Sequence, residues 1–159
     1  MEVPLARLRE LALALPRPGC DWEERPHFEM PTTSEHLTEY EQAVGFPLPG
    51  DVRAFLAEVG AVVGMSVHNG YWLGDVERLT CSVKYGDYPK HVGNDPVAPI
   101  ATDGGGNAFL LSASGPIWRW DHETEKMSKV ATSFAAFLDR VVADWEAYVS
   151  DTPRWKFLV

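Results

Sequence analysis

The sequence is poor in cysteine and has no long apolar run. It contains two cysteines, Cys20 and Cys81, so the dense disulfide framework of a small secreted domain is not expected. Arg7, Arg9 and Glu10 interrupt the apolar N-terminal segment, which excludes the core of a signal peptide. No apolar stretch approaches the about 20 residues that a membrane-spanning helix requires. We therefore expect a cytoplasmic protein whose two thiols are reduced.

Basic side chains are also scarce. Lys and Arg total 14 against 23 Asp and Glu, so the net charge is −9. Nucleic acid and anionic membranes are recognised by clustered basic residues, and neither is expected as a partner. The acidic excess lies mainly in residues 1–80, which carry 13 acidic and 6 basic side chains. This asymmetry is typical of a surface that keeps a protein soluble or of one that attracts a basic partner.

Motifs of common catalytic and metal centres are missing. The sequence has no CxxC, HExxH or GxSxG motif, and its histidines fall at no recognised ligand spacing. Asp121, His122 and Glu123 are adjacent, but neighbouring residues on a strand point to opposite faces. We therefore predict no catalytic residue, no metal and no cofactor. A His–Asp pair assembled in space is the alternative that the sequence leaves open.

The most glycine-rich segment is Asp-Gly-Gly-Gly-Asn at residues 103–107. A phosphate-binding loop needs glycines that open a helix, whereas residues 108–111 have the pattern of a strand. We interpret the segment as a tight β-turn in which Asp103 and Asn107 bond the local backbone and Gly105 adopts a positive φ. A small-ligand site near this turn and His122 is a further alternative.

Apolar residues at helical spacing predict four helices. The first covers residues 4–15, and the second begins at a capping box formed by Thr32 and Glu35 and stops at Gly45. The third runs from Pro49 to Gly60. The last is long and capped by Thr132, with an apolar face of Phe134, Phe137, Leu138, Val141, Trp145 and Tyr148.

Between the helices, alternating patterns predict strands at residues 27–30, 61–67, 71–73, 97–102, 108–112, 116–122 and 126–130. A turn is expected at residues 68–70, and residues 80–96 have the composition of a long loop. Helices, then a strand meander, then a closing helix predict an α+β fold in which a mostly antiparallel (mixed) sheet packs against N-terminal helices and a long C-terminal helix. We expect one domain over residues 1–159.

The strand at residues 116–122 places Trp118, Trp120 and His122 on one face and Arg119 on the other. If Trp120 points into the core, Trp120→Ala should cost about 3–5 kcal/mol. Arg119→Ala should then cost well under about 1 kcal/mol unless the guanidinium is paired.

Four segments occur in a distinctive order: EQAVGFPLPGDVRAFL at residues 41–56, PIATDGGGN at 99–107, IWRWDHE at 117–123 and SFAAFL at 133–138. Together they resemble the SUKH superfamily, which includes fungal cell-wall-synthesis regulators and bacterial toxin-immunity proteins. The resemblance implies an α+β fold and a non-enzymatic role, most often the neutralisation of a polymorphic toxin delivered by a neighbouring cell. The first thirty residues and residues 80–96 fall outside it.

The leading hypothesis is an immunity protein whose acidic surface occupies the basic cleft of a nuclease toxin. Loop position and mixed acid–aromatic character predict the partner-binding residues Tyr71, Trp72, Asp75, Glu77, Asp87 and Tyr88. The competing interpretation is that the two aromatics at 71 and 72 cover one end of the core and the acids are merely solvated. An intracellular regulatory or scaffold protein that binds host proteins, and a small-ligand binder or enzyme, are the other function classes. No feature of the sequence indicates an oligomeric state.

Overall fold

The computed structural model describes residues 2–14, 27–65, 67 and 70–159. Its helices are α1 (Glu2–Ala14), α2 (Ser34–Val44), α3 (Gly50–Val59), α4 (Val76–Tyr85) and α5 (Phe134–Val149). Its strands are β1 (His27–Phe28), β2 (Ala61–Met65), β3 (Tyr71–Gly74), β4 (His91–Val92), β5 (Asp95–Asp103), β6 (Ala108–Ser112), β7 (Ile117–Asp121) and β8 (Lys126–Ala131). The predicted α+β class, with helices at both ends of the chain around a strand meander, is confirmed.

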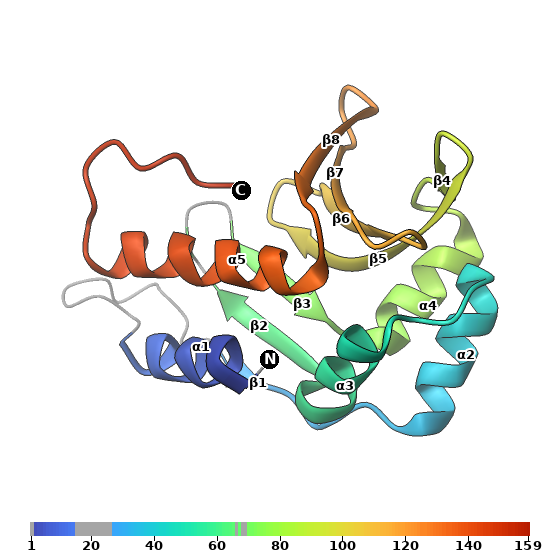
Figure 1. The fold of residues 1–159 in the computed structure, drawn as a ribbon, viewed down its shortest axis with the longest axis horizontal. Coiled ribbons are helices and arrows are strands. Elements are labelled where there is room, and N and C mark those ends of the chain that lie inside the picture. Colours follow the sequence, from blue (N-terminus) through green and yellow to red (C-terminus); the bar gives the residue numbers. More distant parts are fainter. Residues whose placement is uncertain (1, 15–26, 66, 68–69) are drawn as a thin grey trace.

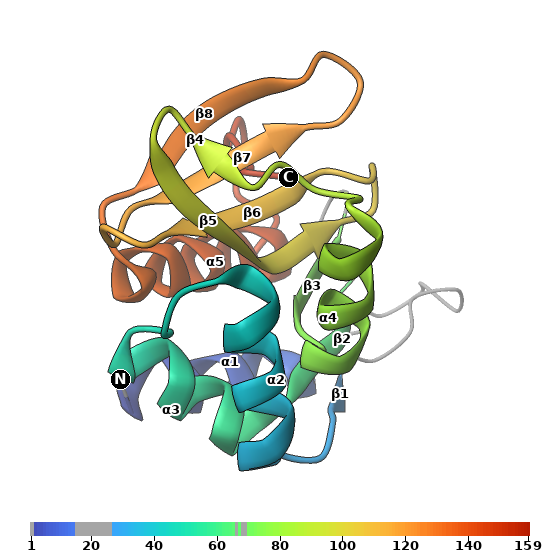
Figure 2. The ribbon, with the colours of Figure 1, turned by 90° about the vertical axis from the view of Figure 1, so that its right-hand side faces the viewer.

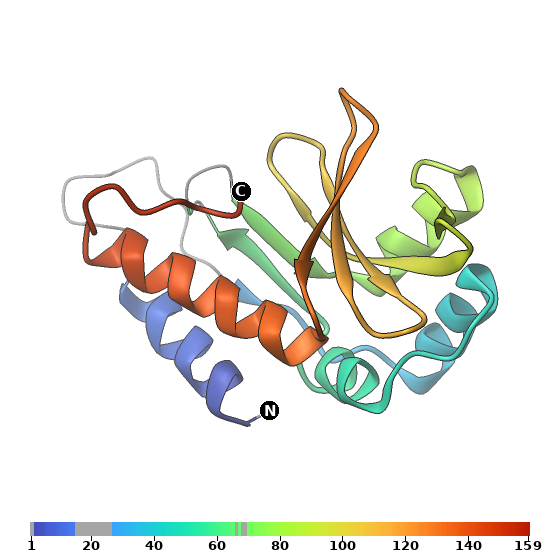
Figure 3. The same ribbon diagram turned by 45° about the horizontal axis from the view of Figure 1, so that its top comes forward.

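The strands form one sheet whose order is β1-β2-β3-β5-β6-β7-β8, with β4 paired to β5 off this path (Figure 1). Every pairing among the described strands is antiparallel. The register places Tyr71 opposite Asp103 and Ala108 opposite Trp120. Because side chains alternate along a strand, this register decides which residues share a face of the sheet. The strands from β5 to β8 coil away from β1–β3, as Figure 3 shows.

Local capping explains where α2 and α5 begin and where α2 and α3 end. The hydroxyl of Thr33 accepts a hydrogen bond from the His36 N–H at the start of α2, and Gly45 closes that helix with φ +84°. Gly60 follows the end of α3 with φ +69°. The last helix, α5, is capped by Ser133, which accepts from the Ala136 N–H. The prediction that Thr132 caps this helix is therefore off by one residue.

The prediction of a loop at residues 80–96 is wrong, because α4 extends to Tyr85 and a short strand follows. Val76, Leu79 and Val83 of α4 do recur at helical spacing, but the residues that bound the helix favoured a loop in the prediction. Asp75 caps the N-terminus by accepting from the Arg78 N–H, and Gly86 ends the helix with φ +81°. Both residue types are also common in turns, which explains the error. Cys81 is a free thiol exposed on this helix, while Cys20 lies outside the described residues.

The main core lies between one face of the sheet and α5. Phe109 stacks on Tyr71 with ring centroids 5.8 Å apart and contacts Phe137 of α5 at 5.0 Å. The rings of Phe55 and Phe134 join α3 to the start of α5. These aromatic contacts belong to a core cluster that also takes in side chains from all five described helices. The opposite face of the sheet holds a smaller cluster of Val97, Ala108 and Leu110, against which Tyr88, Val92, Trp120 and Met127 pack.

The helices gather at two ends of the sheet. Helices α1 and α5 lie side by side (Figures 1 and 3), joined by an ion pair of 2.7 Å between Arg7 and Glu146. Helices α2 and α4 lie side by side at the other end (Figure 2). Lys84 of α4 bonds Glu39 of α2 at 2.5 Å across that contact. In the described part of the chain, no helix has the length and apolar character to cross a bilayer.

Candidate functional site

A groove of about 790 Å³ lies where the N-termini of α2 and α4 meet the segment that follows β1. Its apolar lining comes from Phe28, Met30, Pro31, Ala61 and Val76. Its polar lining includes His36 of α2 with Asp75 and Glu77 of α4. The structure thus brings two of the six predicted partner-binding residues to one groove.

The carboxylates beside this groove differ in how freely they can meet a partner. Asp75 is tied to Arg78 twice, through the helix cap and through an ion pair of 3.0 Å. It also has φ +61°, a conformation that Asp tolerates better than most residues. Glu77 is 73% exposed, and among the described residues it pairs with the imidazole Nδ1 of His36, at 2.9 Å. Glu77 is therefore the more available charge of the two.

Two further predicted partner-binding residues, Asp87 and Tyr88, follow the C-terminal end of α4. Asp87 is exposed, and its N–H donates to the Ser82 carbonyl oxygen, which completes the helix end. Tyr88 is half-buried and packs edge-on against Trp120, with centroids 6.1 Å apart. An α-helix rises about 1.5 Å per residue, so Asp87 lies about 15 Å from Glu77 along α4. These four predicted residues therefore lie at the two ends of α4, with Asp75 and Glu77 at its start and Asp87 and Tyr88 after its end.

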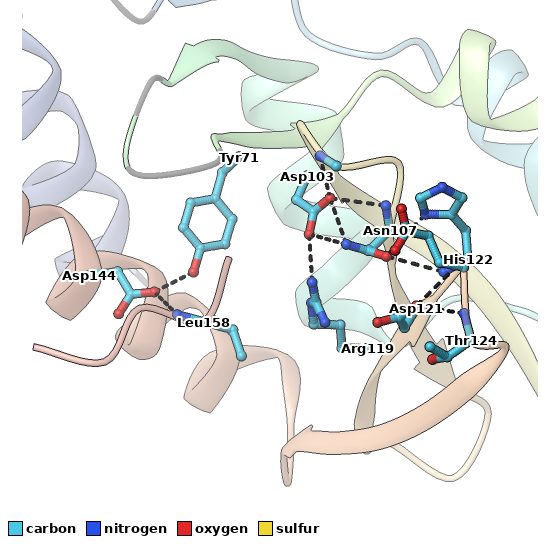
Figure 4. Close-up of polar contacts among 11 residues, drawn as sticks. Tyr71, Asp103, Asn107, Arg119, Asp121, His122, Thr124, Asp144 and Leu158 are labelled. Carbon is cyan, nitrogen blue, oxygen red and sulfur yellow. Dashed lines mark hydrogen bonds and ion pairs between the residues drawn. The ribbon is translucent and has the colours of Figure 1, made fainter.

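Tyr71 does not lie on the surface, which corrects its assignment as a partner-binding residue. Its side chain is fully buried, and its hydroxyl donates to Asp144 of α5 at 2.5 Å (Figure 4). Burial, reinforced by this hydrogen bond, raises the pKa of the phenol well above its ordinary value. Trp72 lies on the opposite face of β3 and is half-buried. Alternation along the strand separates the two rings, so at most one of them can contact a partner.

Asp144 is the most connected buried carboxylate that the sequence analysis missed. Besides Tyr71, it accepts hydrogen bonds from the Trp155 indole and the Leu158 N–H, each at 2.8 Å. The guanidinium of Arg140 lies 3.2 Å away. Figure 4 shows Tyr71 and Leu158 converging on the same carboxylate. The arrangement fastens the C-terminal segment to α5 and β3, and it leaves this acid committed to neighbouring donors.

The glycine-rich segment forms the expected turn, and Asp103 organises it. Its buried carboxylate accepts from the N–H of Gly105 at 2.9 Å, from the N–H of Asn107 at 3.0 Å and from the Asn107 side chain (Figure 4). Arg119 adds an ion pair of 3.1 Å. The positive φ occurs at Gly106, not at Gly105 as predicted. A Cβ atom at Gly106 would stand 3.3 Å from the His122 ring, so protein atoms already occupy that side of the turn.

The adjacent residues at 121–123 do not converge on a common point. The carboxylate of Asp121 accepts from the N–H groups of Thr124 and Glu123 (Figure 4), and hydrogen bonds from Thr124 are the main cause that lowers the pKa of Asp121. His122 is exposed, and its ring contacts the Asn107 side chain at 3.3 Å. The described residues contain no group of three or more His, Cys, Asp or Glu side chains placed to hold a metal ion.

Trp120 is not a main-core residue, so the expected difference in stability between the Trp120→Ala and Arg119→Ala variants changes. Trp120 is half-buried beside the small cluster, whereas Arg119 pairs with buried Asp103. Trp120→Ala should lower the free energy of unfolding by about 2 kcal/mol, through lost burial and the lost contact with Tyr88. Arg119→Ala should cost a similar amount, about 2 kcal/mol, because Asp103 loses a charged donor. Urea denaturation measures both.

Lys129→Ala is the control for these two variants, because Lys129 is exposed on neighbouring β8. It should change the free energy of unfolding by less than about 0.5 kcal/mol. If Arg119→Ala were as mild as Lys129→Ala while Trp120→Ala cost twice the expected amount, Trp120 would belong to the main core and Arg119 to the solvent. That result would contradict the assignment of Trp120 and Arg119 to their respective faces of β7.

Comparison with known proteins gives one family. The model of the SMI1 / KNR4 family (SUKH-1) matches residues 31–140 of this chain. The matched range runs from the groove wall through α5's first turns and leaves out the first thirty residues, as expected. It includes residues 80–96, so the expectation that this segment lies outside the resemblance is wrong. No curated protein matches the chain.

Proposed function

The chain belongs to the SMI1 / KNR4 family (SUKH-1), and from this membership we propose that it is a single, non-enzymatic, protein-binding domain of the immunity type. In this proposal it neutralises a polymorphic toxin inside the cell that the toxin enters. The family match carries the proposal, because it covers most of the chain and agrees with the resemblance that the sequence motifs indicate.

The charge of the chain supports a basic toxin domain as the partner. A nuclease must hold a polyanionic substrate, so its cleft is basic, and a protein with net charge −9 is attracted to it. Opposed charges speed the encounter, while a few buried anchors hold the complex. Exposed acids on α2 and α4 and just after α4, including Glu35, Glu77 and Asp87, support this proposal.

The polar networks support a binding role over a catalytic one. Asp103 and Asp144 are the two buried carboxylates of the described chain, and each is occupied by several protein donors. A general base needs a lone pair that can reach a substrate proton. In contrast, carboxylates bonded in this way hold loops and segments in place, which suits a rigid scaffold that presents a surface.

The charge hypothesis is tested with a catalytically inactive form of a cognate nuclease toxin domain, which is sought first among the genes next to the gene for this chain. Raising salt from about 50 to 500 mM should slow association at least about tenfold, since screening shortens the range of the field. The double variant Glu77→Lys, Asp87→Lys should slow it further at low salt. These positions are preferable to Asp75, whose side chain caps α4.

Stopped-flow fluorescence of the tryptophans measures the association rate, and thermal denaturation checks that the double variant is folded. An association rate unaffected by salt and by charge reversal would exclude an electrostatic mimic of nucleic acid. If the chain binds host proteins and protects against no toxin, it is the intracellular regulator that the same family also contains.

A further inference from the structure

The groove between α2, α4 and the segment after β1 has a fixed backbone. The N–H of Glu29 donates to the Ala61 carbonyl oxygen at 2.9 Å, and the N–H of Thr32 donates to the Leu56 carbonyl oxygen at 3.2 Å. On the other wall, the N–H of Asp75 donates to the Gly60 carbonyl oxygen at 3.3 Å. Because main-chain bonds hold both walls, the groove does not need to form when a partner arrives.

The lining of the groove combines apolar surface with negative charge. Met30 is 85% exposed at its edge, one of the few large apolar side chains in the described chain that solvent surrounds. Phe28 is half-buried, and the guanidinium of Arg9 covers its ring at 4.6 Å. No Lys or Arg is among the lining residues that the structure describes, whereas Glu77 lies there largely in solvent.

The surface of α2 next to the groove is also negatively charged. A shallow depression on α2 is lined by Ser34, Glu35, Thr38, Glu39 and Gln42, again without a basic residue among those described. Glu39 is paired with Lys84, but Glu35 forms no ion pair within the described chain. A volume of about 790 Å³ is enough for several side chains, within the range of about 300–1,000 Å³ typical of binding pockets.

We propose that this groove is the docking site for a basic segment of the protein partner, in which a Lys or Arg meets Glu77 and a neighbouring apolar side chain packs on Met30. The identity of the partner rests on the proposed function, but the chemistry of the docked segment rests on the groove. Complementary charge selects the segment, and burial of Met30 against it slows dissociation.

Two probes test the site. The first is a synthetic peptide of about twelve residues that alternates lysine and leucine, with an alternating glutamate–leucine peptide as its charge control. In NMR titrations of the full chain, the basic peptide should shift amide signals of residues 29–36 and 75–78, and the acidic peptide should not. Signals that move mainly on β7 and β8 would overturn the proposal, because that surface is remote from the groove.

The second probe is the inactive toxin domain, measured against matched pairs of variants. Met30→Ser should raise Kd about tenfold, while Leu13→Ser, which removes a similarly exposed apolar residue from α1, should leave Kd unchanged. Glu77→Lys should slow association and also speed dissociation about tenfold. Asp87→Lys changes the charge equally at the other end of α4 and should slow association only.

The outcomes separate the site from the function. Peptide binding in the groove without protection against the toxin would keep the docking site and overturn the immunity role. Tight toxin binding that Met30→Ser and Glu77→Lys leave unchanged would keep the immunity role and overturn the docking site. Equal effects of Glu77→Lys and Asp87→Lys on both rates would also overturn it, because only long-range attraction would then remain.

Discussion

Asp144→Ala should lower the free energy of unfolding by about 3–5 kcal/mol, because a buried donor that loses its acceptor costs about 1–3 kcal/mol and several donors share this carboxylate. The carboxylate is fully buried, and its removal leaves the hydroxyl of Tyr71 and the indole N–H of Trp155 without their acceptor. The guanidinium of Arg140 also loses its ion pair. Urea denaturation followed by tryptophan fluorescence measures the loss.

Asp139→Ala is the control, because Asp139 is exposed on the same helix. It should change the free energy of unfolding by less than about 0.5 kcal/mol. Asp144→Asn keeps the shape and some acceptor capacity, so its cost should be intermediate. Hydrogen exchange should show the Leu158 N–H losing protection in Asp144→Ala before the core does. Equal unfolding midpoints for the alanine variants at 139 and 144 would mean that the Asp144 network contributes nothing to stability.

The sequence indicated that α5 is amphipathic, but not that Asp144 lies on its buried side with partners. Position 144 is three residues after Val141 and directly before Trp145, both of which are buried. An acid on the apolar face of a helix is itself a signal of a buried polar contact, because an unpaired buried charge is costly. Arg140, four residues earlier on α5, is a local partner, but no local pattern connects Asp144 with Tyr71 or with the last five residues.

Periodicity predicted which strand residues share a face, but not which face meets α5. Trp118 and Trp120 do alternate with Arg119, as expected. The main core, however, is formed from the other face, where Phe109 and Ile117 point toward α5. Both faces of this sheet carry apolar residues, so the pattern alone cannot decide which face packs against α5. Tyr71 was chosen as a partner-binding residue for its loop position and acid–aromatic character, and its burial agrees instead with the competing interpretation that it covers part of the core.

The candidate groove could be predicted only in part. Asp75 and Glu77 were chosen as an acid pair in a supposed turn-rich segment, and both do line the groove. The opposite wall comes from residues 28–33, which are more than forty positions away. The helical period of the sequence predicts α2, and the acid–aromatic character of its segment indicates Glu77. Only the fold brings Met30 into the same groove. Non-local contacts of this kind are set by the pairing of β1 with β2.

Gly60→Ala should destabilise the protein severely, by about 3 kcal/mol or more, because backbone and packing both oppose a side chain there. Gly60 has φ +69° and ψ −82°, a conformation that side chains rarely adopt. A Cβ atom at this position would stand 1.9 Å from the Met30 carbonyl oxygen. The contact could be relieved only if the segment that forms the groove wall moved away from α3.

Gly45→Ala is the matched control for Gly60→Ala. Gly45 also ends a helix with a positive φ, +84°, but no atom lies within 4 Å of the Cβ position. Its substitution should therefore lower the free energy of unfolding only by the strain of the left-handed conformation, about 1–2 kcal/mol. Thermal denaturation compares the two variants, and the peptide titration shows whether Gly60→Ala also abolishes groove binding in the fraction that folds. If the two alanines cost the same, the Met30 backbone does not approach Gly60 as closely as the structure places it, and this wall of the groove has a different geometry.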